Sequence, residues 1–118
     1  MARPRLITAL SSSVVLALAL GAAACGNQAR NDSIKKANAG VRALGGKQLD
    51  TAVNELKEAV RLYKENHSAW FHLGEAYRGK KVWNEAVAAY TNAVQLKGSD
   101  VMYQLRLGAS PRASIALF

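Results

Sequence analysis

Apolar side chains recur every three or four positions along most of the chain after residue 32, which is the spacing of one helix face. The stripes predict helices at residues 33–44, 49–63, 68–78 and 83–96, separated by short polar or glycine-containing turns such as Gly45-Gly46. No segment shows the strict alternation of a half-buried strand. The chain is therefore predicted to be all-α, with its helices paired in antiparallel hairpins.

The pattern also repeats itself at a fixed offset of 34 positions. The small residues Gly40, Ala52 and Ala59 return as Gly74, Ala86 and Ala93. A constant period of this length is typical of a helical solenoid, in which each hairpin packs on its neighbours. Solenoids usually present a binding surface, so the repeat favours an interaction module.

One copy of the repeat resembles a tetratricopeptide repeat (TPR). The TPR pattern W-x2-L-G-x2-Y followed by A-x3-[FY]-x2-A is matched at every spacing, by Trp70, Leu73, Gly74, Tyr77, Ala86, Tyr90 and Ala93. The resemblance implies a right-handed TPR α-solenoid. It consists of a degenerate first repeat at 33–66, a second repeat at 67–100 and a partial third at 101–118.

The third copy begins at Val101 and departs from the pattern at Pro111, which lies where Tyr77 would recur. Since proline breaks a helix interior, this helix is predicted to end by about Ala109. Residues 110–118 then form a last short helix, or the array is truncated there; both alternatives stay open. Because solenoids depend on interfaces between neighbours, so short an array is expected to self-associate or to gain stability from a partner.

The first 24 residues have the three parts of a secretory signal peptide, namely a basic start, an apolar core and a small-residue exit. A permanent transmembrane helix is the alternative, but Ser11-Ser12-Ser13 leave an apolar core of only about 11 residues, where a span needs about 20. Ala22-Ala23-Ala24-Cys25 resembles the bacterial lipobox. That resemblance implies cleavage before Cys25, acylation of its sulfur and a polar tether at 25–32.

The lipoprotein resemblance also bears on location, because an aspartate after the cysteine favours retention at the inner membrane. Gly26 stands there, so the periplasmic face of the outer membrane is favoured, with a soluble exported protein as the alternative. Removing Arg3 and Arg5 from the 16 basic residues leaves 14 against 8 acidic ones, a formal charge of +6. Basic and acidic side chains alternate along the helices, and an exported protein rarely meets nucleic acid. No nucleic-acid partner is predicted.

The chain offers little catalytic chemistry. His67, His72 and Glu75 are its only candidate cluster, and a metal would need further ligands that the sequence lacks. There is no nucleophile arrangement, no phosphate-binding glycine loop and no second cysteine. We therefore predict no enzyme activity, no metal and no cofactor.

Binding is expected on the concave groove that first helices line in TPR arrays. Carried over by position, the resemblance places there Ile34, Ala37, Asn38, Val41, Phe71, His72, Glu75, Arg78, Met102, Leu105 and Arg106. Phe71 and Arg78 are the favoured anchors, although Phe71 packing on the next repeat is an equal alternative. The expected partner is an amphipathic or extended segment of another envelope protein. The function is thus a membrane-tethered adaptor; the alternative is a non-catalytic fragment or subunit of a larger envelope enzyme.

Overall fold

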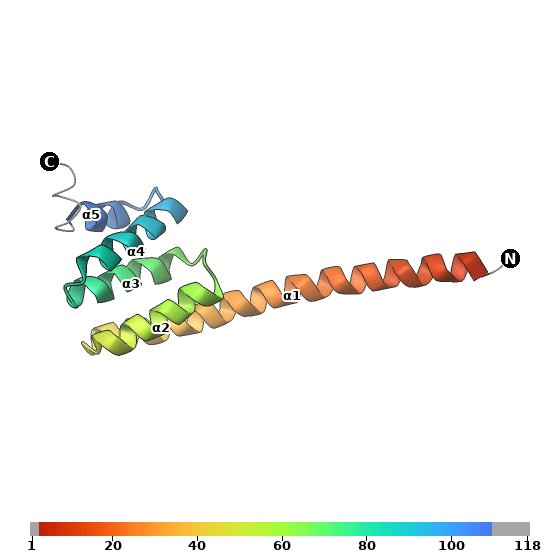
Figure 1. The fold of residues 1–118 in the computed structure, drawn as a ribbon, viewed down its shortest axis with the longest axis horizontal. Helices are drawn as coiled ribbons and strands as arrows, with labels where there is room; N and C mark the ends of the chain where they lie inside the picture. The colour runs from red at the N-terminus through yellow and green to blue at the C-terminus, as the bar shows by residue number, and fades with distance from the viewer. Residues whose placement is uncertain (1–2, 110–118) are drawn as a thin grey trace.

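The computed structural model describes the backbone of residues 3–109 and the side chains of residues 24–109. Over this range it contains helices and no strand, in the order α1 (Arg3–Gly45), α2 (Leu49–Leu62), α3 (His67–Gly79), α4 (Trp83–Leu96) and α5 (Val101–Ala109). Each helix packs on the next one in the sequence, so the predicted all-α solenoid of helical hairpins is confirmed. In Figure 1 the hairpins stack, and the N-terminal part of α1 projects away from them.

The 34-residue period is visible in the backbone. The turn after α1 closes with a hydrogen bond from Gln48 N to Ala43 O, at 2.8 Å, and the turn after α3 closes with Val82 N to Tyr77 O, at 2.9 Å. Lys47 and Lys81 occupy the left-handed region in these turns, with φ of 57° and 60°. Helix α1 thus ends at the predicted stop, Gly45-Gly46. The residue with positive φ in this turn is Lys47. The left-handed residue after a helix lets the last carbonyls find partners.

Each hairpin is held by a glycine that faces a large side chain of the second helix. A Cβ on Gly40 would lie 2.4 Å from Leu56 Cγ, and one on Gly74 would lie 2.5 Å from Tyr90 Cε1. Both large side chains are fully buried. The glycines therefore allow the two helices to approach closely, which is the role expected of small residues in this repeat.

Helix α1 includes residues 25–32, for which the sequence predicts a polar tether. The helix passes through this segment unbroken and ends only at Gly45. The segment contains no proline, and the Gln28 amide donates to both carboxylate oxygens of Asp32 at 3.0 and 3.1 Å. Pairs at this i, i+4 spacing stabilise helices. Helix α1 therefore begins well before Ser33. The apolar period that starts at Ser33 marks the point from which α1 packs on α2.

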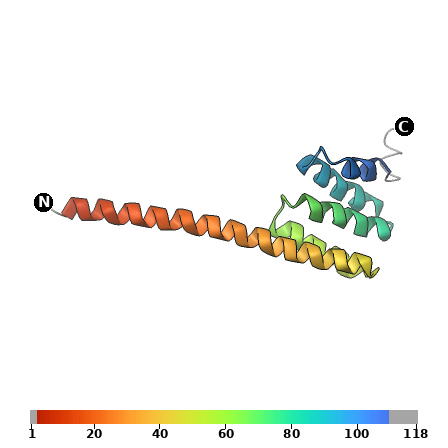
Figure 2. The same ribbon diagram turned by 180° about the vertical axis from the view of Figure 1, so that it is seen from behind.

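The junction between the first two hairpins is polar and buried. Ser33 Oγ donates to Ala59 O at 2.7 Å and accepts from Asn66 Nδ2 at 2.9 Å. Asn66 Oδ1 in turn accepts from Ala69 N, so Asn66 also caps α3. One asparagine thus links α1, the end of α2 and the start of α3. Figure 2 shows α1 and α2 lying side by side, as in Figure 1.

Helix α5 is the last described element of the chain. The predicted end of the third-repeat helix near Ala109 agrees with α5, whereas the two alternatives for residues 110–118 lie outside the described residues. Within the described part, no helix is both long and apolar enough to cross a membrane. The signal-peptide assignment of residues 1–24 stays a prediction.

Candidate functional site

The first helices of the hairpins, α1, α3 and α5, form one side of the stack. Helix α3 contacts α1 and meets α5 through the rings of Phe71 and Tyr103, which stack with centroids 4.7 Å apart and an interplanar angle of 23°. His67 Nδ1 also lies 2.8 Å from Tyr103 Oη. We call the exposed side chains of these three helices the first-helix surface. It carries the predicted binding residues.

Exposed apolar side chains lie at the two ends of this surface. On α1, Ile34 and Val41 are 45% and 38% exposed and Asn38 between them is also exposed. On α5, Met102 and Leu105 are 53% and 60% exposed. The α5 residues lie one turn apart and the α1 residues two turns apart with Asn38 between them, so each helix offers a small patch that is only partly apolar on α1. Ala37, which the resemblance also placed in the groove, is instead buried between α1 and its neighbours.

Between the patches lies a charged cluster centred on Glu75. Its carboxylate pairs with Arg78, at 3.4 Å, and with Arg106 of α5, whose Nε lies 3.1 Å from Glu75 Oε1. It also accepts a hydrogen bond from Tyr90 Oη. Burial and the Glu75 carboxylate both raise the pKa of Tyr90, which keeps the phenol protonated and donating. The predicted residues Glu75, Arg78 and Arg106 are thus brought together by the fold.

Phe71 and His72 take a more structural place than the sequence suggested. Phe71 is half-buried, lies between the rings of Tyr90 and Tyr103, and meets His72 edge-on at 5.3 Å. Desolvation lowers the pKa of His72, although the nearby Glu75 carboxylate acts in the opposite direction. The imidazole is therefore held neutral at pH 7. Of the two favoured anchors, Phe71 packs on the next repeat, and Arg78 remains exposed beside Glu75.

The TPR-pattern residues occupy the interior as their spacing implied. Gly40 and Gly74 form the close helix crossings, and the pattern's alanines are completely buried, namely Ala52, Ala59, Ala86 and Ala93. Leu73 and Tyr90 are also buried, whereas Trp70 and Tyr77 are only partly covered. These last two large rings line a hollow that the sequence did not reveal.

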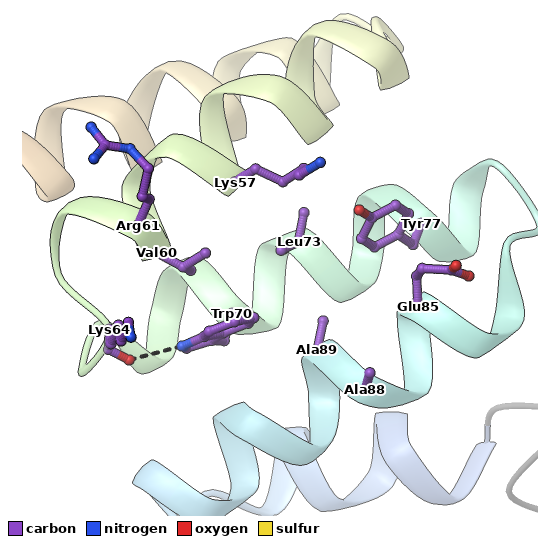
Figure 3. A pocket seen from close by; sticks show the side chains of 10 residues that line it. All are labelled: Lys57, Val60, Arg61, Lys64, Trp70, Leu73, Tyr77, Glu85, Ala88 and Ala89. Carbon is purple, nitrogen blue, oxygen red and sulfur yellow. Dashed lines mark hydrogen bonds between the residues drawn. The ribbon is translucent and has the colours of Figure 1, made fainter.

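This hollow opens between α2 and α4 and has a volume of about 380 Å³. Its floor is formed by α3, through Trp70, Leu73 and Tyr77, as Figure 3 shows. We call it the α2–α4 hollow. A hint in the sequence was the adjacent pair Ala88-Ala89, because two small residues on α4 leave the large rings of α3 without a cover.

The other chemical candidates from the sequence are the group of His67, His72 and Glu75, and Cys25. In residues 24–109, no group of three His, Cys, Asp or Glu side chains is arranged to hold a metal ion. His72 and Glu75 lie on one face of α3. Phe71 contacts His72, and Arg106 of α5 pairs with Glu75. Cys25 is exposed on α1, a position in which its thiol is accessible.

The fold and these surfaces define a class, a short solenoid of helical hairpins with two separate exposed faces. Among solved structures the chain is similar to one described as the Arabidopsis OM64 TPR domain, with a TM-score of 0.69 and 24% sequence identity. The likeness covers 75% of this chain and 73% of that one. No protein-family model and no curated protein matches the sequence. The likeness therefore supports a TPR-like fold and carries no residue-level assignment.

Proposed function

We propose that this chain is a TPR-like adaptor that binds a segment of another envelope protein on its first-helix surface. The observation that carries the proposal is the pair of exposed apolar patches on α1 and α5, with the Glu75 cluster between them. Large apolar side chains that stay exposed at helical spacing are typical of protein-binding surfaces. The TPR-like fold supports the same reading, because solenoids use extended faces for binding.

The chemistry of this surface suggests what the bound segment offers. The apolar patches favour aliphatic or aromatic side chains at the two ends of the segment. In the centre, two guanidinium groups, of Arg78 and Arg106, surround the single Glu75 carboxylate. The exposed guanidinium of Arg78 is accessible beside Glu75, which favours a carboxylate in the middle of the segment.

The membrane tether forms the second part of the proposal. Acylation of Cys25 would place the lipid on α1, eight positions before Ser33, where packing begins. At 1.5 Å per residue this length of helix spans about 12 Å. A multiply acylated cysteine would anchor firmly, since each buried methylene contributes about 0.8 kcal/mol. The helix would then act as a short rigid spacer on the periplasmic face of the outer membrane.

Site-specific crosslinking in a bacterial envelope tests the binding surface. A photoreactive residue replaces the exposed Asn38 or Leu105, and the control position is Gln95, which is exposed on α4. We expect both first-helix positions to capture the same protein and Gln95 to capture none of it. Capture of the same species from all three positions would contradict the proposal.

The tether is tested separately with a Cys25→Ala variant. We expect loss of metabolic palmitate labelling and release of the protein from the membrane fraction. The crosslinked partner should still be captured by solubilised protein, because Cys25 lies on α1 eight positions before Ser33, where α1 begins to pack. Unchanged membrane association of Cys25→Ala would contradict a lipid tether.

A further inference from the structure

The α2–α4 hollow is a second concave surface, and its lining is almost entirely apolar. Three large side chains of α3, Trp70, Leu73 and Tyr77, form its floor, with Val60 and the Ala88-Ala89 pair at its sides. The indole Nε1 of Trp70 donates to Lys64 O at 2.8 Å, as Figure 3 shows. This bond satisfies the only polar atom of the ring and fixes its position. A fixed aromatic floor is a feature of binding hot spots.

The α2 side of the hollow's rim is basic, whereas the α4 side carries one acidic residue. Lys57 and Arg61 lie one turn apart on α2, and Lys64 follows in the next turn of chain, so three cations border one edge. Arg61 is bound by Glu58 at 2.6 and 2.7 Å, while no ion pair among the described side chains engages Lys57 or Lys64. Glu85 is the single acidic residue of the lining and lies on α4. The α2 edge therefore carries uncompensated positive charge.

We propose that the α2–α4 hollow is a second docking site, which takes an amphipathic helix of another protein with an apolar ridge and acidic side chains along the flank that faces α2. The apolar ridge would cover the rings of Trp70 and Tyr77, and the acidic flank would pair with Lys57 and Lys64. A volume of about 380 Å³ lies near the lower end of the 300–1,000 Å³ of binding pockets, which suits a few inserted side chains.

Electrostatics disfavours a second copy of this chain as the helix that binds in the hollow. Even without residues 1–24 the chain carries 14 basic and 8 acidic residues, a formal net charge of +6, so two copies repel each other, and the cationic α2 edge adds to that repulsion. An acidic helix is attracted by the same field. The two sites share α3 but use different residues of it, namely Trp70, Leu73 and Tyr77 in the hollow and Glu75 and Arg78 on the first-helix surface, so we expect either site to bind when the other is blocked.

The test uses the purified full chain and two labelled synthetic peptides, each about 18 residues or five helical turns long. Both carry leucine at i, i+3, i+4 and i+7, and they differ only in having glutamate or lysine along one flank. Fluorescence anisotropy measures their dissociation constants. Because several exposed charge pairs act together, we expect the acidic peptide to bind about tenfold more tightly than the basic one.

Matched substitutions locate the binding. Lys57→Glu reverses a rim charge, and we expect it to weaken the acidic peptide about fivefold. The control Lys47→Glu makes the same charge change at an exposed position in the α1–α2 turn, and should change affinity by less than about twofold. Ala88→Gln places a larger polar side chain in the hollow and should weaken both peptides about fivefold. Its control is Asn84→Gln, at an exposed position of the same helix that does not line the hollow.

Circular dichroism checks that every variant keeps its helical content. Equal affinity for the two peptides, or equal effects of Lys57→Glu and Lys47→Glu, would overturn the proposal. Self-association that Ala88→Gln abolishes would also overturn it, by showing a second copy as the occupant. A failure of this kind leaves the crosslinks from Asn38 and Leu105 unaffected, so it is distinguishable from failure of the proposed adaptor function.

Discussion

The hairpin α1–α2 and the hairpin α3–α4 share a backbone and differ in the side chains that fill it. Equivalent turn hydrogen bonds and equivalent positive φ angles recur 34 positions apart. The glycine crossing is also repeated, but Gly40 meets Leu56 where Gly74 meets Tyr90. The backbone repeat thus depends on small residues and turns, whereas the large positions are free to vary.

The outer positions of the two hairpins explain why the first one looks degenerate. Trp70 lines the hollow between α2 and α4, and its counterpart Lys36 pairs instead with Glu55 of α2, at 3.0 Å. Leu73 is buried against the preceding hairpin, and its counterpart Ala39 is only half-buried. A terminal repeat of a solenoid needs a more polar outer face. Among residues 3–109 no hairpin packs before α1 and α2, and the loss of the aromatic pattern in residues 33–66 is consistent with such an outer face.

The largest expected difference between the hairpins is at their central large side chain. Tyr90→Ala should lower the free energy of unfolding by about 3–5 kcal/mol, because it leaves a ring-sized cavity and removes the hydrogen bond from Tyr90 to Glu75. Leu56→Ala removes fewer atoms and should cost about 2–4 kcal/mol. Urea unfolding followed by circular dichroism measures both. The half-exposed Leu96→Ala on α4 is the control, and a loss there equal to that of Tyr90→Ala would contradict the packing.

The glycine crossing gives the next largest effect. Gly74→Ala would place a methyl group 2.5 Å from the Tyr90 ring, and we expect a loss of about 1–3 kcal/mol from overpacking. Gly45→Ala, at an open position near the end of α1, should be neutral or stabilising by up to about 1 kcal/mol. In a Tyr90→Ala background the cost of Gly74→Ala should nearly vanish. Additive losses in this double-mutant cycle would show that Tyr90 does not set the crossing.

The sequence predicted most of the fold because its signals are local. Helical periodicity gave four helices, and the fixed offset gave the hairpins and the buried small residues. It did not reveal the helical conformation of residues 25–32, since a polar composition does not show that Gln28 and Asp32 support a continuing helix. It placed Phe71 correctly on α3, yet its stacking on Tyr103 depends on how two repeats meet. The α2–α4 hollow was missed for the same reason, because it is bounded by three helices.

The junction between the first and second hairpins should depend on the buried hydroxyl of Ser33. Ser33 is completely buried and links Ala59 to Asn66, so Ser33→Ala leaves the Asn66 amide without its partner. We expect a loss of about 1–2 kcal/mol in the free energy of unfolding. The control Ser99→Ala alters an exposed serine in the turn before α5 and should have an effect below about 0.5 kcal/mol. Equal effects would mean that the buried hydroxyl contributes nothing to the junction.

The smallest effect concerns pH and distinguishes the second hairpin from the first, in which Asn38 stands at the position of His72. Burial lowers the pKa of His72 in the folded chain, so the unfolded chain binds this proton at a higher pH. The stability that neutral His72 provides is therefore present above the unfolded pKa, about 6.5, and decreases as the pH falls below it. His72→Gln should reduce the loss of stability between pH 7 and pH 5, measured by urea unfolding at each pH. Between pH 7.5 and pH 8.5 the two proteins should show the same pH dependence. An identical slope in the acidic range would show that His72 does not remain neutral through burial.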